Sequence, residues 1–289
     1  MTTADIGVIT RRRFAVSRRL ASLGPITAVA GAVCALLVLA AVVGPLIAPY
    51  DPLELDPSNA YSGSTGAHWL GADDLGRDNL SRLIYGARSS LLGAALIVVM
   101  SSVLGTGLAL AAAWFGGVVD TLICRAIDIV FSFPGLILAV IASTVFGGGF
   151  FPPLCALAIA FTPMLARIVR SAAVRERRLP YIAALQVQGT PAWSICLRHL
   201  LPNVMPLVVV QAVIGFGYAL VDLSAIAFLG LGIQPPAPDW GLMAANGQSS
   251  ILGGHPEQSL YAGLTVMISV VSFNLVGERV VQHLEKEFR

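Results

Sequence analysis

Residues that could carry out covalent or metal chemistry are few and scattered in this sequence. The four histidines and four cysteines include no pair at metal-ligand spacing, and no HExxH or GxSxG motif occurs. They are His68, His199, His255 and His283, and Cys34, Cys124, Cys155 and Cys196. The only lysine is Lys286, which excludes a P-loop, because that turn uses a lysine to hold nucleotide phosphates. We therefore predict no catalytic residue, no metal site and no bound cofactor. If ATP drives the function, a separate chain binds it.

Two carboxylates in apolar surroundings are candidates for a functional role. Asp128 falls within one long apolar stretch, and Asp222 falls where another ends. A charged side chain in hydrocarbon costs about 2.5–3.5 kcal/mol on insertion scales, so it usually faces the protein interior or a water-filled path. Asp128 follows Arg125 by three residues, so a local ion pair is one alternative for it. Asp222 is the better candidate for facing a water-filled path, with an arginine partner or an interfacial position as the alternative.

The composition is that of a membrane protein. Of the 289 residues, 56% are hydrophobic and 12% are charged, against about 25% charged in an ordinary soluble domain. The mean hydropathy is +0.80. The formal net charge is only +2 and no basic stripe is interleaved with aromatic residues, which excludes a nucleic-acid partner. The apolar excess must therefore face the lipid bilayer.

The apolar stretches predict an all-α integral membrane protein with six transmembrane helices. About 20 apolar residues cross the roughly 30 Å hydrocarbon layer, and no period-2 alternation indicates a barrel. The predicted spans lie near 25–47, 89–119, 123–145, 153–170, 203–222 and 260–280. The organisation that follows is a basic tail (1–24), a first helix with an outer segment (25–88), a five-helix core (89–281) that includes a loop at 174–202, and a second tail (282–289).

The arginines predict the orientation in the membrane. Five of them precede the first span and five more crowd residues 167–178, and such clusters tend to stay in the cytoplasm. With an even number of crossings, both termini and the loop at 174–202 are then cytoplasmic. Residues 51–78 and 230–259 fall on the outer side.

The loop at 174–202 has a helical pattern of its own. Pro180 suits the first turn of a helix, the run Gly189-Thr190-Pro191 ends it, and Trp193 begins a second short helix before the fifth span. An amphipathic helix on a membrane surface either docks a partner or packs on lipid, and its pattern does not decide between the two.

The loop resembles the EAA loop of binding-protein-dependent ABC importers through the pattern Y-x-x-A-x(4)-G-x(11)-L-P. In that family the loop supplies the coupling helix, which sits in a groove of the ATPase subunit. The resemblance assigns ATPase coupling to Tyr181, Ile182, Ala184, Gly189, Thr190, Leu201 and Pro202. Two positions depart from the pattern: Ala183 replaces the family's glutamate and Leu185 replaces an alanine. The carboxylate is therefore missing, but the turn that Gly189 sets is kept.

The outer segments resemble the C-type permease of the dipeptide/oligopeptide/nickel branch of the same family. The resembling stretches are HWLGADDLGRD (68–78), SRL (81–83), GARSSL (86–91), FLGLG (228–232), QPP (234–236) and PDWG (238–241). The motif residues are Gly71, Asp73, Leu75, Gly76, Arg77, Asp78, Ser81, Arg82, Pro236, Trp240 and Gly241. On physical grounds the clustered Asp and Arg side chains either stiffen a cap over the second helix or form a rim that docks a receptor. We expect Trp240 to anchor at the membrane interface.

The resemblance implies a type I-like permease subunit of an ATP-driven importer in the cytoplasmic membrane of a bacterium, moving di- or oligopeptides by alternating access. The implied partners are a second homologous permease, one or two cytoplasmic ATPase subunits that bind ATP and Mg, and an extracytoplasmic substrate-binding protein. A nickel-chelate importer of the same family is an alternative. A secondary transporter driven by an ion gradient is a weaker one, since the sequence has no convincing internal repeat.

Overall fold

The computed structural model describes residues 25–287, with side chains described for 25–282, so the predicted tail at 1–24 lies outside the described residues. Five long helices dominate: α2 (Pro25–Ile47), α3 (Asn79–Phe115), α6 (Phe151–Arg177), α9 (Leu201–Phe228) and α12 (Glu257–Glu287). The shorter elements are η1 (Pro57–Asn59), α4 (Gly117–Phe131), α5 (Gly135–Phe146), α7 (Pro180–Val187), α8 (Ala192–Ile195), the π-helical turn η2 (Cys196–Leu200), α10 (Trp240–Asn246) and α11 (Gln248–Leu252).

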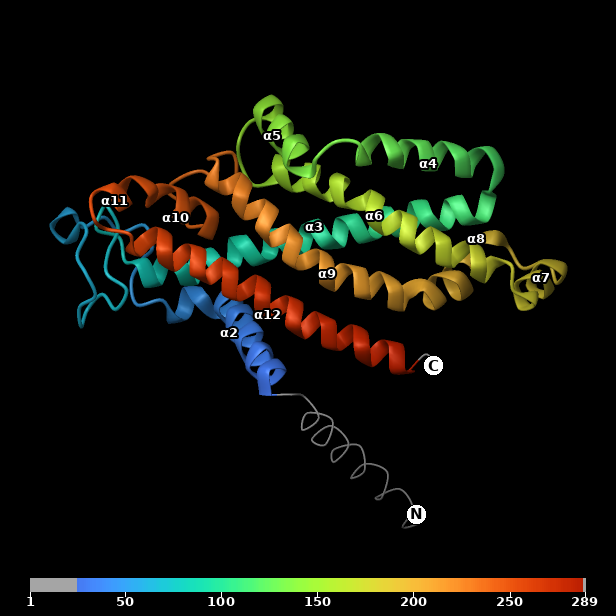
Figure 1. The fold of residues 1–289 in the computed structure, drawn as a ribbon, viewed down its shortest axis with the longest axis horizontal. Coiled ribbons are helices and arrows are strands. Elements are labelled where there is room, and N and C mark those ends of the chain that lie inside the picture. Colours follow the sequence, from blue (N-terminus) through green and yellow to red (C-terminus); the bar gives the residue numbers. More distant parts are fainter. Residues whose placement is uncertain (1–24, 288–289) are drawn as a thin grey trace, which may run out of the picture.

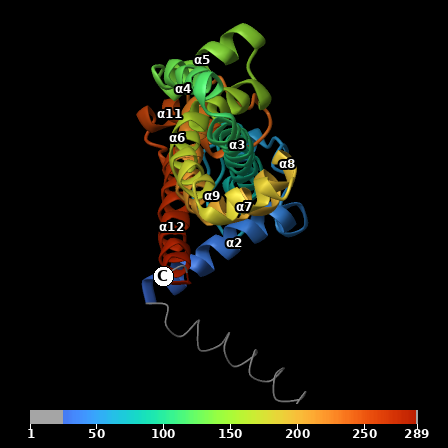
Figure 2. The same ribbon diagram turned by 90° about the vertical axis from the view of Figure 1, so that its right-hand side faces the viewer.

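The helices form one elongated bundle around α3 (Figure 1). Seen from the end that carries α7 and α8, α3 lies between α4 and α6 on one side and α2 on the other (Figure 2). Small residues allow this close packing: Gly105 of α3 faces α6 so closely that an added Cβ would lie 2.7 Å from Leu165 Cδ2. One apolar core fills the half of the bundle near α10 and a second fills the half near α7.

Within residues 25–287, five helices are long and apolar enough to cross a membrane, and a sixth crossing exists only if the bent pair α4 and α5 counts as one. The prediction of one straight span over 123–145 is therefore wrong, since these two helices meet at 82°. The cause is Pro134, which has no N–H and disfavours helical geometry in Phe133 before it. Pro134 is extended, with φ −58° and ψ 131°, and begins α5.

Two other spans differ from their predicted bounds. The second begins ten residues early, at Asn79 rather than Ser89, because the Asp78 carboxylate caps the helix by accepting the N–H of Ser81. The fifth continues to Phe228, so Asp222 lies inside the helix and the predicted position at its end is wrong. On its other side α9 is joined through η2 to α8, giving one apolar helix over Ala192–Phe228.

Candidate functional site

The bundle has two functionally distinct ends, which we name by their short helices. The α7 end comprises residues 170–203 with the last turn of α3, and the α10 end comprises residues 48–90 and 229–256. They lie at opposite ends of α3, since Arg177 donates to the Ala113 carbonyl (2.7 Å) whereas Trp240 donates to the Leu83 carbonyl (2.9 Å).

At the α7 end, one buried apolar side chain, Ile182, and one partly buried one, Leu185, fix α7 to the bundle. Ile182 is 1% exposed and packs in the core cluster that contains Val169 and Ile195. The rest of the surface stays open: Val187 is 90% exposed and Trp193 is 62% exposed. Exposed apolar groups of this kind are typical of interaction sites.

The turn after α7 depends on Gly189. Its φ of +75° lies in the left-handed region, where L side chains are strained. The turn is closed by two backbone bonds, Gly189 N–H to Gln186 O (3.0 Å) and Thr190 N–H to Leu185 O (3.0 Å), and Pro191 begins α8. Gly189 therefore sets the angle between α7 and α8.

A hydrogen-bonded triad ties α7 to the two long helices that flank it. The Tyr181 hydroxyl and the Asn203 amide each donate to Glu176 Oε1 (2.6 Å for both), and the same amide lies 2.9 Å from the Tyr181 oxygen. Partial burial, reinforced by the Glu176 carboxylate, raises the pKa of Tyr181 to about 12. The hydroxyl therefore stays protonated and keeps its donor role at neutral pH.

The sequence motif finds Tyr181 but misses its two partners. The sequence does contain a signal that could have identified Glu176, because it is the only acidic residue between Phe151 and Asn203. Among the other motif positions, Leu201 and Pro202 form the first turn of α9, and Ala184 and Thr190 lie in α7 and its following turn. The structure therefore gathers all seven predicted coupling residues on one continuous segment.

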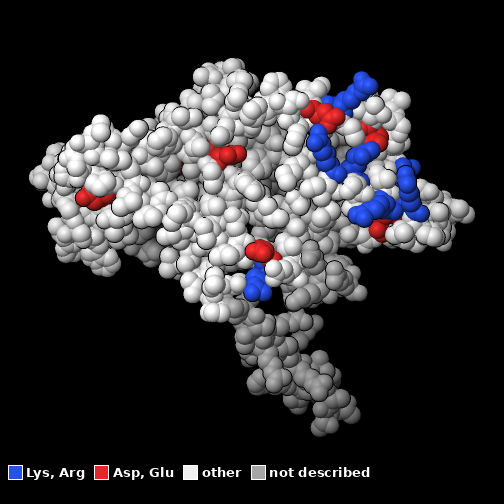
Figure 3. Space-filling model, in the orientation of Figure 1, with Lys and Arg blue, Asp and Glu red and all other residues white. Residues whose placement is uncertain are grey.

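Charged side chains concentrate toward the α7 end on the face shown in Figure 3. Two ion pairs connect α4 to α6: Arg170 with Asp120, and Arg167 with Asp128 (2.5 Å). The suggested local pair between Asp128 and Arg125 is wrong, since the partner comes from 39 residues away. Arg167 also lies 4.4 Å from the Phe131 ring centroid, next to the break between α4 and α5.

At the α10 end, the charged motif residues are buried and paired. Asp73 accepts from Arg77 Nε (2.7 Å) and from the backbone N–H groups of Leu75 and Arg77 (2.9 Å each). Arg82 is fully buried, donates to the Pro52 carbonyl (3.1 Å) and lies 3.6 Å from Asp73. Burial of the whole cluster favours a stiff cap over α3 rather than an exposed docking rim.

Two glycines in the left-handed region and a helix cap also determine the backbone path at the α10 end. Gly71 and Gly76 have φ of +67° and +78°, and a Cβ on Gly76 would lie 1.7 Å from the Asp56 carbonyl oxygen, so no side chain fits there. Asp78 accepts from the Ser81 hydroxyl (2.7 Å) and lies 3.0 Å from His68 Nδ1.

Trp240 is part of the core, so the prediction that it anchors at the membrane interface is wrong. It is 0% exposed and lies against Gly86, where an added Cβ would come within 3.0 Å of the indole. The preceding Asp239 caps α10 through the N–H of Gly241 (3.0 Å) and accepts from the Ser90 hydroxyl (2.7 Å). Burial raises the pKa of Asp239, while these hydrogen bonds oppose the rise. Pro236 lies exposed in the segment before this cap.

Asp222 belongs to a polar stripe along α9. Gln211, Gly215, Tyr218 and Asp222 recur every three or four residues, which places them on one helix face. The first three line a small cavity of about 50 Å³ together with Ser101 and Ser102 of α3. Asp222 is half-buried and has no ion-pair partner among the described residues.

The family model for the binding-protein-dependent transport system inner membrane component matches residues 101–289. The chain belongs to this family. It is 36% identical over 252 residues to the dipeptide transport system permease protein DppC of Alkalihalophilus pseudofirmus, covering 87% of this chain and 83% of that one. It is 37% identical to the di/tripeptide permease DppC of Pseudomonas aeruginosa (88% and 86% covered) and 33% identical to the glutathione permease GsiD of Pectobacterium atrosepticum (90% and 86% covered).

Among solved structures, the chain resembles a chain of the MetNI methionine ABC transporter in an inward-facing conformation, with a TM-score of 0.55 and 20% identity over 70% of this chain and 96% of that one. This likeness confirms the predicted fold of an ABC importer permease. Family membership makes the chain a multi-pass inner-membrane component of a transport system and not an enzyme.

Proposed function

We propose that this chain is one of two permease subunits of an ATP-driven importer of short peptides. The observation that carries the proposal is identity of 36% and 37% to dipeptide and di/tripeptide permeases over nearly nine-tenths of the chain. The architecture agrees with it, since one end offers an open helix for a partner and the other is a rigid, buried cap.

The α7 end is where the ATPase couples. Exposed apolar groups such as Val187 suit a groove on an ATPase subunit, and the orientation expected from the arginines places this end, with both termini, in the cytoplasm. When ATP closes the ATPase pair, α7 moves with its groove. The triad of Glu176, Tyr181 and Asn203 passes that movement to α6 and α9 together, and the spans alternate between inward and outward access.

The polar stripe on α9 is the wall of the translocation path, and Asp222 is its charged residue. A carboxylate with no partner in its own chain, inside a span, is suited to face water or substrate. A peptide presents an ammonium group that such a carboxylate attracts. The opposite wall comes from the second permease, and a substrate-binding protein delivers the peptide to the α10 end.

The test is uptake of a labelled dipeptide by proteoliposomes that contain the complete importer with its binding protein. We expect uptake that needs ATP inside the vesicles and persists after an ionophore collapses the ion gradients. Uptake that follows the ion gradient and ignores ATP would overturn the proposal. Uptake of a nickel chelate in place of the dipeptide would leave the ATP-driven importer standing but change its substrate.

A substitution at Gly189 tests the coupling site directly. Gly189→Arg combines a strained left-handed residue, costing about 1–2 kcal/mol, with a long side chain at the docking surface. We expect ATP-coupled uptake to be lost while the protein still inserts and assembles. The matched control is Gly189→Asn, because asparagine tolerates positive φ, and it should keep most of the uptake. Normal uptake by Gly189→Arg would exclude this turn from coupling.

A further inference from the structure

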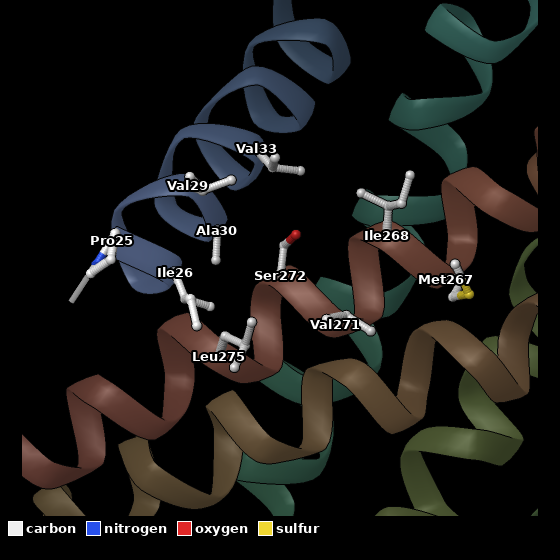
Figure 4. Close-up of a pocket in the computed structure, with 10 residues that line it drawn as sticks. All are labelled: Pro25, Ile26, Val29, Ala30, Val33, Met267, Ile268, Val271, Ser272 and Leu275. Carbon is white, nitrogen blue, oxygen red and sulfur yellow. The ribbon is translucent and has the colours of Figure 1, made fainter. Parts of the chain in front are cut away.

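An apolar groove of about 500 Å³ runs between α2 and α12, away from both ends described above. Figure 4 shows Ile26 and Ala30 of α2 pointing toward α12, and Ile268 and Ser272 of α12 pointing toward α2. Apart from the Ser272 hydroxyl, the lining side chains are apolar. Since α2 packs mainly against α3 and α12, the groove lies at the periphery of the bundle.

A polar cluster stands at one mouth of this groove. Arg279 Nε lies 3.3 Å from Thr27 Oγ1, and Arg279 Nη1 lies 3.2 Å from Gln282 Oε1. Gln282 Nε2 in turn lies 3.5 Å from Glu278 Oε1. Glu278, Arg279 and Gln282 continue the α12 face that lines the groove through Leu275, and all three are exposed. The mouth therefore offers a guanidinium and a carboxylate that both contact the Gln282 amide.

The depth of the cluster matches a lipid headgroup. No charged residue separates Glu257 from Glu278 along α12, a helical distance of about 31 Å that equals the roughly 30 Å hydrocarbon layer. On α2, Thr27 lies in the first turn and contacts Arg279, so the start of α2 lies at the level of this polar cluster. The groove below the cluster is therefore at the depth of the acyl chains.

The size of the groove suits an acyl chain and not a protein segment. One turn of helix, about 10 Å across and 5.4 Å long, occupies roughly 400 Å³, so a transmembrane helix cannot enter a groove of about 500 Å³. A thin flexible chain can follow it. Because a guanidinium stands next to a carboxylate, the charge pattern complements a headgroup that carries both a phosphate and an amine.

We infer that the α2–α12 groove is a binding site for a zwitterionic phospholipid with a primary amine. One acyl chain occupies the groove, Arg279 and Thr27 hold the phosphate, and Glu278 accepts the ammonium group. The site tethers the peripheral helix α2 to the bundle at the leaflet of the α7 end. The inference rests on the chain's membrane embedding and is independent of which substrate it transports.

The experiment is native mass spectrometry of the complete importer, delipidated in mild detergent and titrated with phosphatidylethanolamine or phosphatidylglycerol. Arg279→Gln should weaken retention of both lipids by about tenfold, the value of one charged hydrogen bond. Glu278→Gln should remove the preference for phosphatidylethanolamine while leaving phosphatidylglycerol bound. Arg125→Gln, at another exposed arginine, is the control and should change neither.

A groove-filling variant separates the site from general charge effects. Val271 lines the groove and is half-exposed, so Val271→Trp should fold normally and displace the lipid without altering any charge. Equal affinity of the wild type for the two lipids, or retention unchanged in both Arg279→Gln and Val271→Trp, would overturn the inference. Disulfide crosslinking of Val271→Cys to the second permease would also overturn it, because protein would then cover the groove.

Discussion

The two ends of the bundle use charge in opposite ways. At the α10 end, Asp73, Arg77 and Arg82 are buried and joined to one another and to backbone groups. Toward the α7 end, the pair of Arg167 and Asp128 between α4 and α6 is 47% and 61% exposed, and α7 is anchored by the apolar side chains of Ile182 and Leu185. The difference predicts a rigid end that keeps its shape and, under the proposed coupling, a hinged end that moves with the ATPase.

Two of the four tryptophans, Trp240 and Trp193, offer the largest contrast between the ends. Trp240→Ala should destabilise the permease by about 3–5 kcal/mol, as expected for the loss of a large buried side chain. The substitution also removes the indole hydrogen bond to the Leu83 carbonyl. Trp193→Ala removes an exposed ring and should change stability by about 0.5 kcal/mol or less. Thermal unfolding of the detergent-solubilised protein measures both. Similar losses of stability would contradict the assignment of Trp240 to the core and Trp193 to the surface.

Substitutions of arginine should show the same contrast in stability between the two regions, with smaller losses. Arg77→Gln removes the closer of the two arginines that pair with the buried Asp73 carboxylate, leaving the longer contact to Arg82 (3.6 Å), and should cost about 3 kcal/mol. Arg167→Gln breaks a half-exposed pair and should cost about 0–1 kcal/mol. High salt should weaken the half-exposed pair of Arg167 and Asp128 and leave the buried pair of Arg77 and Asp73 unaffected. If Arg167→Gln proved as costly as Arg77→Gln in the same unfolding assay, the α7 end would be as rigid as the α10 end.

Glu176 should combine a small change in stability with a clear change in function. Glu176→Gln keeps the shape of the triad but removes the charged acceptor of Tyr181 and Asn203, so stability should fall by about 1 kcal/mol. The informative measurement is the number of peptides imported per ATP hydrolysed, which should fall severalfold while ATP hydrolysis continues. Tyr181→Phe should move the same ratio in the same direction. An unchanged ratio in both variants would mean that the triad positions α7 without transmitting its movement.

Local signals in the sequence were sufficient to predict many of the helices and many of the motif residues of this molecule. Hydropathy located the long helices, Pro180 and Gly189 bounded α7, and the motifs identified residues that the structure gathers at two ends. The bend at Pro134 was equally local and could have been predicted from the proline alone. The role of Trp240 was not accessible in this way, because a tryptophan beside an aspartate and a glycine suits an interface as well as a core.

By itself, the sequence determined that the chain lies in lipid, which segments are helical and which family the chain belongs to, because these properties depend on composition and short-range spacing. Only the tertiary structure decided which charges are paired and which surfaces are free. Arg167 meets Asp128 across 39 residues, and Ser90 meets Asp239 across 149. Burial and pairing are set by the packing of distant helices, so the rigid end, the hinged end and the groove along α2 become visible only when the chain is folded.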